Sequence, residues 1–314
     1  MSLRIITILG PTACGKTAVA TQLAAKLDGE IISADSRQVF RGMDIGTGKD
    51  LADYDIKVSD ASGTRTLHIP YHLIDIAEAG TKYSVFHFQR DFFKAYEDIC
   101  SRGRQPILCG GTGLYIESVL RGYNLVEVPA DTETRNDLEG KTLAELKEIL
   151  ASYKQLHNTT DVDTARRAIR AIEIEEYYRT HNVDKTLPSP TVDSLTIGLN
   201  IPRDLRRQRI TDRLHKRLNE GMVDEVQRLL DEGVKPEALI SYGLEYRYLT
   251  LYLTNQISYD EMVRQLEIAI HQFAKRQMTY FRGMERRGVT IHWIDATKPF
   301  DEIVEEIKRL TKEL

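Results

Sequence analysis

The chain has 314 residues, 41% of them hydrophobic, which is enough to bury one large core with or without an inserted domain. Its net charge of −4 gives it none of the overall basic character that marks many nucleic-acid-binding domains. It has neither a secretory leader pattern nor an 18-residue apolar segment, so we expect a cytoplasmic protein without a membrane span. Its three cysteines form no C-x-x-C pair and are expected to be free thiols.

The first predicted elements enclose a glycine-rich loop. An apolar run from Leu3 to Leu9 predicts a strand, and Thr17 to Leu27 has apolar residues at helical spacing. The loop "GPTACGKT" between them matches G-x-x-x-x-G-K-[ST], a strong signal for a phosphate-binding loop in this strand-to-helix context. The predicted phosphate-binding residues are Gly10, Pro11, Thr12, Ala13, Cys14, Gly15, Lys16 and Thr17.

This loop predicts a bound diphosphate without identifying the compound. Glycines let backbone N–H groups converge on the anion, the helix N-terminus adds its dipole, Lys16 neutralises charge, and Thr17 is the expected Mg²⁺ ligand. A kinase or hydrolase of this class also needs a carboxylate at the end of an apolar strand, and Asp75 is a weak candidate for it.

A second loop, "SADSRQVFRGMDIGTGK", follows the next predicted strand. Asp35 lies just after that strand, where ligands bind in a doubly wound sheet. On position alone, Asp35 could be a metal ligand, a general base or a helix N-cap.

Short apolar runs continue along the chain, and amphipathic segments such as Val85 to Cys100 lie between several of them. They predict an α/β fold, a P-loop type of parallel sheet with helices on both faces. The further strand candidates are Glu30–Ser33, Tyr71–Ile76, Pro106–Gly111, Leu195–Asn200 and Val289–Ile294.

Two stretches have a purely helical pattern. Residues 131–180 are charged and contain no strand candidate, which predicts a helical insertion subdomain. Arg203 to Arg287 is again helical, with one long helix expected over Tyr259 to Arg287. We therefore expect residues 1–122 and 190–314 to form the core and residues 123–189 to form the insertion.

Five motifs in order carry a family resemblance: "GPTACGKT", "SADSRQVFRGMDIGTGK", "YHLIDI" with "YSVFHFQRD", "PILCGGTGLYI" and "AKRQMTYFR". Together they resemble the tRNA dimethylallyltransferase family, the tRNA isopentenyltransferases that modify adenosine 37 beside the anticodon. The resemblance extends from Leu3 to about Trp293.

The resemblance implies transfer of a dimethylallyl group from dimethylallyl diphosphate to N6 of adenosine 37, in tRNAs that read codons beginning with U. The diphosphate would be the leaving group, with Mg²⁺ as the cofactor. Because the N6 lone pair is delocalised into the ring, the reaction needs a general base, and the family's catalytic Asp matches Asp35. Thr112 matches the threonine near the bridging oxygen, and Arg213 matches a diphosphate-facing arginine.

Three basic clusters on this acidic protein predict a surface suited to phosphates, and the resemblance implies that it binds tRNA. Seven basic residues lie between Arg203 and Arg217, and others crowd the late helix. Taken singly, each cluster is more often a solvated helix face, but three clusters beside the motifs above favour binding. By resemblance, the insertion contacts the anticodon stem-loop, the C-terminal helices bind tRNA, and the adenine flips out of its stack. The tRNA-binding residues would be Asp35, Ser36, Arg37, Gln38, Arg166, Arg167, Arg170, Lys275, Arg276, Gln277 and Arg282.

Two departures from the family pattern fall on the tRNA-binding side. The insertion lacks the family's D-P-x-x-A stretch, and "SYGLEYR" stands where the family commonly has Gly-Tyr. The family often has Trp at the position of Tyr280, a change that preserves an aromatic ring.

We expect the tRNA enzyme to be a monomer. Three alternative functions are also compatible with parts of the sequence. An isopentenyltransferase for free adenine nucleotides shares the loop and the base but does not need the basic helices. A small-molecule kinase needs only the loop. A nucleic-acid-binding module with a vestigial loop is hard to reconcile with intact Lys16, Thr17 and Asp35.

Overall fold

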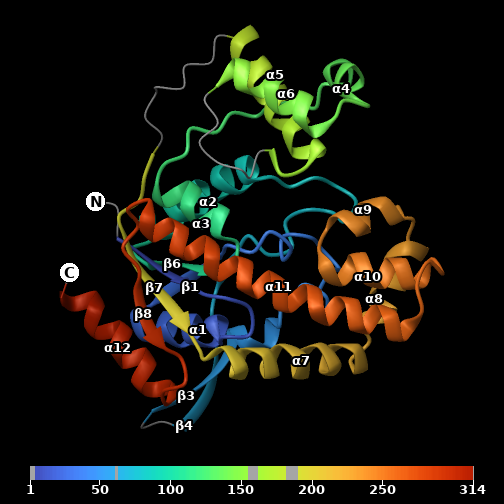
Figure 1. Cartoon of the computed structure of the whole chain (residues 1–314). Helices are drawn as coiled ribbons and strands as arrows, with labels where there is room; N and C mark the ends of the chain where they lie inside the picture. Colours follow the sequence, from blue (N-terminus) through green and yellow to red (C-terminus); the bar gives the residue numbers. More distant parts are fainter. Residues whose placement is uncertain (1–3, 61–62, 155–161, 182–189, 314) are drawn as a thin grey trace. The chain divides into compact units, whose positions relative to one another are not determined.

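The computed structural model describes residues 4–60, 63–154, 162–181 and 190–313 (Figure 1). It separates into two compact units, a core unit of Met1–Tyr123 with Pro190–Leu314 and a helical unit of Asn124–Ser189. The predicted strand start at Leu3 and the linker residues 182–189 lie outside the described residues. Over the described ranges, none of the helices combines the length and the apolar character that crossing a membrane requires.

The core unit contains a six-stranded sheet in which every pairing is parallel, which confirms the predicted fold class. The strand order is β5-β2-β6-β1-β7-β8, so the loops after β1 and β6 lie side by side at the carboxyl end of the sheet. In such sheets this is where ligands bind. The strands are β1 (Ile5–Leu9), β2 (Gly29–Ser33), β5 (Tyr71–His72), β6 (Gln105–Gly110), β7 (Ser194–Asn200) and β8 (His292–Asp295).

Helices cover both faces of this sheet because its strands bury side chains on both sides. Ile6 and Ile8 of β1 pack with α1 (Lys16–Leu27) and α12 (Phe300–Glu313) on one face. Ile5 and Leu9 point to the other face, which α2 (Val85–Ser101), α3 (Gly113–Leu120) and part of α11 (Tyr259–Arg286) cover. The predicted helix from Val85 is confirmed, and Ser84 and His87 form its N-terminal capping box.

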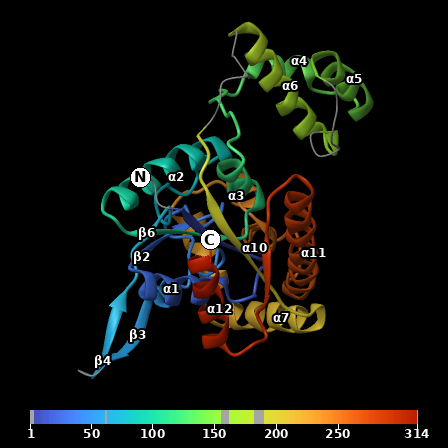
Figure 2. The same cartoon turned by 90° about the vertical axis from the view of Figure 1, so that its left-hand side faces the viewer.

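The region between β2 and α2 differs from the prediction. The strand expected over Tyr71–Ile76 ends at His72, because Leu73 and Asp75 take positive φ angles that interrupt an extended chain. The antiparallel hairpin of β3 (Asp55–Asp60) and β4 (Gly63–His68) was not predicted, since its sequence contains few apolar residues. This hairpin projects from the rest of the core unit (Figure 2). The short helix η1 (Leu51–Tyr54) precedes it.

A layer of helices follows β7 and confirms the predicted helical stretch. Its long final helix, α11, ends at Arg286, one residue before the predicted end. Three apolar residues of the loop after β2, Val39, Phe40 and Met43, are buried among these helices, so the loop is anchored to the layer. The other helices are α7 (Arg203–Asn219), α8 (Met222–Asp231), α9 (Pro236–Ser241) and α10 (Leu244–Leu253).

The helical unit has its own small core. It contains α4 (Thr132–Leu138), α5 (Leu143–Tyr153) and α6 (Ala165–Thr180), and its described residues include no strand. Leu146 and Leu150 of α5 pack against Ala168 and Ile172 of α6. Thr142 and Glu145 form a capping box that fixes where α5 begins.

Candidate active site

A cavity of about 520 Å³ opens at the carboxyl end of the sheet in the core unit. That volume is typical of a small-molecule site. Residues from the two predicted loops, from the turn after β6 and from α7, α10 and α11 line it. The predicted site residues in its wall are Thr12, Lys16, Thr17, Asp35, Ser36, Arg37, Gln38, Thr112, Arg213, Arg276 and Gln277.

The phosphate loop runs from β1 into α1. Ala13 and Gly15 have φ angles of 62° and 87°, which turn the backbone toward the first turn of the helix. The Lys16 ammonium donates to the Pro11 carbonyl at 2.8 Å. Of the eight loop residues, Thr12, Lys16 and Thr17 reach the cavity wall, while Gly10, Pro11, Ala13, Cys14 and Gly15 form the loop behind them.

Asp35 and Thr112 lie on adjacent loops that approach closely. A Cβ on Gly110 would lie 2.3 Å from the Ala34 carbonyl oxygen, so only glycine allows this approach. The Thr112 hydroxyl accepts from the Ser36 N–H at 3.1 Å, and Asp35 Oδ1 accepts from the Arg37 N–H at 2.8 Å. This last bond closes a turn, and residues 36–39 that follow Asp35 are not helical, so the structure gives Asp35 no helix to cap.

The next residues secure the loop around Asp35. The Gln38 amide accepts from the Ser33 hydroxyl at 2.9 Å and donates to the Gly48 carbonyl at 3.0 Å, so it joins β2 to the far end of the loop. Arg37 lines the cavity, and burial lowers the pKa of its guanidinium.

The segment from Asp44 to Lys49 is held by buried charges. Glu225 accepts from the backbone N–H groups of Asp44, Ile45 and Gly46 at 2.7 to 3.0 Å. Lys49 is buried and donates to the carboxylates of Asp44 and Asp75. Asp75 therefore has a structural ion pair, which explains its poor fit as a carboxylate of the kinase type.

The α7 helix contributes two arginines to the cavity. Arg213 and Arg217 donate to Asp50 Oδ2 at 2.6 and 3.2 Å. The family pattern predicts Arg213, whereas in the sequence Arg217 is one member of a basic run. Its i, i+4 spacing from Arg213 was the signal that could have identified it.

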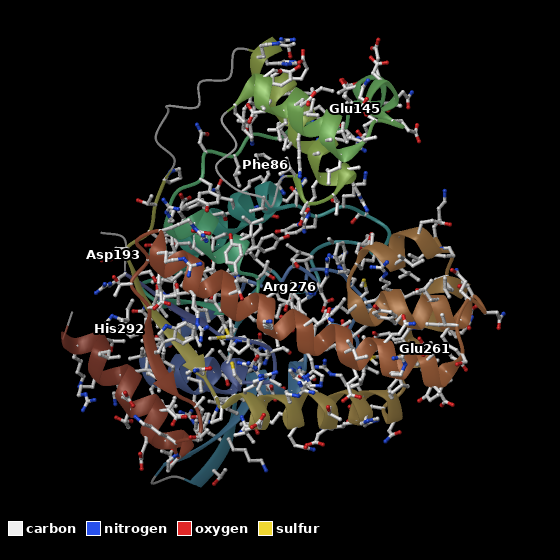
Figure 3. All side chains as sticks on the ribbon, viewed as in Figure 1. Phe86, Glu145, Asp193, Glu261, Arg276 and His292 are labelled. Atoms are coloured by element: carbon white, nitrogen blue, oxygen red, sulfur yellow. The ribbon has the colours of Figure 1, made fainter. Side chains whose placement is uncertain are left out.

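The α11 helix gives the site a wall and an exposed basic edge. Gln277 is 8% exposed, accepts from the Thr12 N–H and donates to the Gly111 carbonyl, both at 2.9 Å. These bonds favour a role in joining the two glycine loops over the predicted contact with a nucleotide. Lys275, Arg276 and Arg282 are exposed, and Figure 3 labels Arg276 part-way along the helix.

Tyr280 also belongs to the α11 wall of the cavity. Its hydroxyl donates to the buried Glu117 at 2.8 Å, and Arg287 donates to the same carboxylate at 2.6 and 2.8 Å. These donors hold the pKa of Glu117 below its usual value although burial opposes them. The hydrogen bond from its hydroxyl to Glu117 therefore fixes the position of the Tyr280 ring.

Glu245 is a cavity residue that sequence reasoning missed. It lies in the first turn of α10, within "SYGLEYR", and burial raises its pKa. The departure of this segment from the family pattern was the available signal.

The three predicted arginines of the insertion lie on α6 of the helical unit. Arg166 and Arg167 are exposed, and Arg167 pairs with Asp163 at 2.5 Å. Arg170 donates to the carbonyls of Val128 and Pro129 and to Glu173, so it supports the fold of this unit.

Comparison with known proteins gives consistent matches along the chain. The family model described as IPP transferase matches residues 38–284, and one described as isopentenyl transferase matches residues 3–59. The chain is 63% identical to tRNA dimethylallyltransferase 1 of Parabacteroides distasonis and 61% identical to tRNA dimethylallyltransferase 2 of Porphyromonas gingivalis. Each alignment covers 98% of both chains.

Solved structures agree with these matches. The full-length tRNA isopentenylpyrophosphate transferase of Bacillus halodurans is 32% identical, with a TM-score of 0.69 over 99% of this chain and 96% of that chain. A eukaryotic dimethylallyltransferase acting on tRNA shares the fold, with a TM-score of 0.71 at 23% identity over 94% of this chain and 75% of that chain. The chain therefore belongs to the IPP transferase family, together with the tRNA dimethylallyltransferases that it matches over almost its whole length.

Proposed function

We propose that this enzyme transfers a dimethylallyl group from dimethylallyl diphosphate to N6 of adenosine 37 in tRNAs that read codons beginning with U. The observation that carries the proposal is one cavity that joins a phosphate loop to the loops of Asp35 and Thr112. A diphosphate on the phosphate loop and an adenine beside Asp35 would share this one cavity. The tRNA dimethylallyltransferases among the relatives support this choice of substrates.

Asp35 is the proposed general base. Its Oδ1 holds the Arg37 N–H, which fixes the side chain, so Oδ2 would accept a proton from N6 as the C–N bond forms. Ser36, Arg37 and Gln38 would surround the flipped adenine. Because Thr112 accepts from the Ser36 N–H, its own hydroxyl proton is available for the bridging oxygen of the donor.

The phosphate loop, Lys16 and Arg213 would bind the diphosphate and stabilise the negative charge that develops on it. The Thr17 hydroxyl stands at the first turn of α1, in the cavity wall, and fits a Mg²⁺ ion that takes most of its ligands from phosphate and water. When bound, Mg²⁺ would neutralise charge on the leaving diphosphate.

The exposed basic residues would bind tRNA phosphates. On α11 these are Lys275, Arg276 and Arg282, and on α6 they are Arg166 and Arg167. Arg276 also lines the cavity, so it is the residue of this group that would contact the flipped nucleotide. We propose that residues 1–122 and 190–314 carry the reaction and that residues 123–189 contact the anticodon stem-loop. The enzyme would act as a cytoplasmic monomer.

An acceptor test with labelled dimethylallyl diphosphate and Mg²⁺ separates the rival functions. Unmodified tRNA containing A36-A37-A38 competes with AMP in one reaction, and ATP consumption is followed in parallel. We expect label in tRNA only. Label in AMP alone would identify a free-nucleotide enzyme, and release of ADP without transfer would identify a kinase.

A further inference from the structure

The cavity has more positive than negative charge in its wall. Five cationic side chains face two carboxylates there, those of Asp35 and Glu245. An excess of positive charge in a partly enclosed cavity attracts an anion. The cations are Lys16, Arg37, Arg213, Arg217 and Arg276.

Arg217 is the more enclosed of the two α7 arginines. Its side chain is 12% exposed, compared with 34% for Arg213. Burial and repulsion from Arg213 lower the pKa of its guanidinium, which nevertheless keeps its charge. Asp50 is its only ion-pair partner among the described residues, and Arg213 shares that carboxylate. One carboxylate therefore serves two guanidinium groups.

Both guanidinium groups lie against the backbone of Gly48. A Cβ there would lie 2.0 Å from Arg217 Nη2 and 2.6 Å from Arg213 Nη2, and the φ of +66° also requires glycine. Gly48 lines the same cavity, and its carbonyl accepts from Gln38. The loop of Asp35 and the two arginines are thus packed as one unit.

We propose that Arg217 is a second diphosphate-binding arginine, which works with Arg213 as a pair of guanidinium forks on the donor. Asp50 holds the two side chains next to each other despite their like charges. The remaining N–H groups bind phosphate oxygens, for which the planar guanidinium is well suited. This inference rests on the proposed diphosphate site.

The test measures binding of inorganic pyrophosphate with Mg²⁺ to the full chain by calorimetry. We expect Arg217→Ala to weaken binding about tenfold or more, and Arg217→Lys to fall in between because it keeps the charge but loses the fork. We expect Asp50→Asn to bind as well as wild type or more tightly, because the Asn amide oxygen can still accept from both guanidinium groups while the negative charge beside the anion is removed. Arg207→Ala, an exposed arginine of the same helix, controls for lost charge and should leave the affinity unchanged.

The outcomes separate the inference from the function on which it rests. Lys16→Ala should abolish pyrophosphate binding and so shows that the proposed diphosphate site exists. If it does, wild-type affinity in Arg217→Ala, or an equal loss of affinity in Arg217→Ala and Asp50→Asn, would overturn the role of Arg217. If wild type itself does not bind pyrophosphate, both the inference and the proposed site fail. Should Arg217→Ala not fold, as judged by circular dichroism, Arg217→Lys and Asp50→Asn still give opposite expected signs.

Discussion

Glu225 illustrates how single residues outside the cavity shape it. Its carboxylate accepts three backbone N–H groups of the loop before Gly48 and the hydroxyl of Tyr246 at 2.6 Å. These donors are buried or partly buried, so without Glu225 they would have no partner. A residue on α8 thereby sets the path of the loop that carries Gly48 and Asp50.

We predict that Glu225→Ala costs about 3 kcal/mol or more of folding free energy, because several donors lose their acceptor. Tyr246→Phe removes one of the four hydrogen bonds and should cost about 1 kcal/mol. Urea unfolding of both variants and wild type measures the difference. Equal, small losses in the two variants would contradict the proposed role of Glu225.

Glu245 predicts a pH dependence of stability. Burial raises the pKa of its carboxyl above the ordinary value of 4.5, so the folded state binds a proton that the unfolded state has released. Stability from this group is fully present below the unfolded pKa and is lost as pH rises through the folded pKa.

Glu245→Gln removes that ionisation. We expect the variant to be more stable than wild type at pH 8, with a difference that shrinks as pH falls toward 4.5. Denaturation of both proteins at pH 5 and pH 8 tests the sign. A difference that grows toward low pH would mean that the carboxylate is stabilised in the folded state.

At the scale of elements, the sequence predicted most of what surrounds the site. Strands β1, β2 and β6 are apolar runs that end in glycine or in the Asp35 loop, so the sequence predicts both that they are strands and where they lie in the chain. The hairpin β3–β4 was missed because its residues are mostly exposed and polar. The strand from Tyr71 was predicted too long because Leu73 and Ile74 are apolar and buried, as strand residues would be, but they lie in a turn.

The contacts of the site were less predictable than its elements. Asp35, Thr112 and Arg213 came from the family pattern, and nothing local in the sequence brings them to one cavity. Gln277 lies in a basic motif that suggests nucleic-acid contact, yet its amide joins two loops that lie 166 and 265 residues away in the chain. Arg217 and Glu245 depend on the packing of α7 and α10, which residue spacing alone does not determine.

On α11, the exposed cations are expected to bind tRNA, whereas the buried Gln277 has a structural role. We predict that Arg282→Ala weakens tRNA binding and lowers the slope of log affinity against log salt by about 1, with pyrophosphate binding unchanged. Arg264→Ala, which removes an exposed arginine paired with Glu261 on the same helix, is the control. Equal salt slopes for Arg282→Ala and wild type would exclude a phosphate contact at this position.

For the whole molecule, we propose that the two compact units have different roles in the reaction. The residues that line the cavity all belong to the core unit. The helical unit carries Arg166 and Arg167 on a small core of its own. We therefore expect Arg166→Ala with Arg167→Ala to raise the KM for tRNA while the KM for dimethylallyl diphosphate stays the same. Steady-state kinetics with each substrate varied in turn measures this, and a changed KM for the donor would contradict it.

We propose that Asp35 takes the proton as the dimethylallyl group moves to N6 of adenosine 37. The most direct measurement compares wild type with Asp35→Asn in single-turnover transfer to unmodified tRNA, with the modified nucleoside located by digestion and mass spectrometry. We predict modification at position 37 alone, and a transfer rate about 10² to 10⁴ lower in Asp35→Asn with pyrophosphate affinity unchanged. Transfer by Asp35→Asn at the wild-type rate, or modification at another nucleotide, would contradict this assignment.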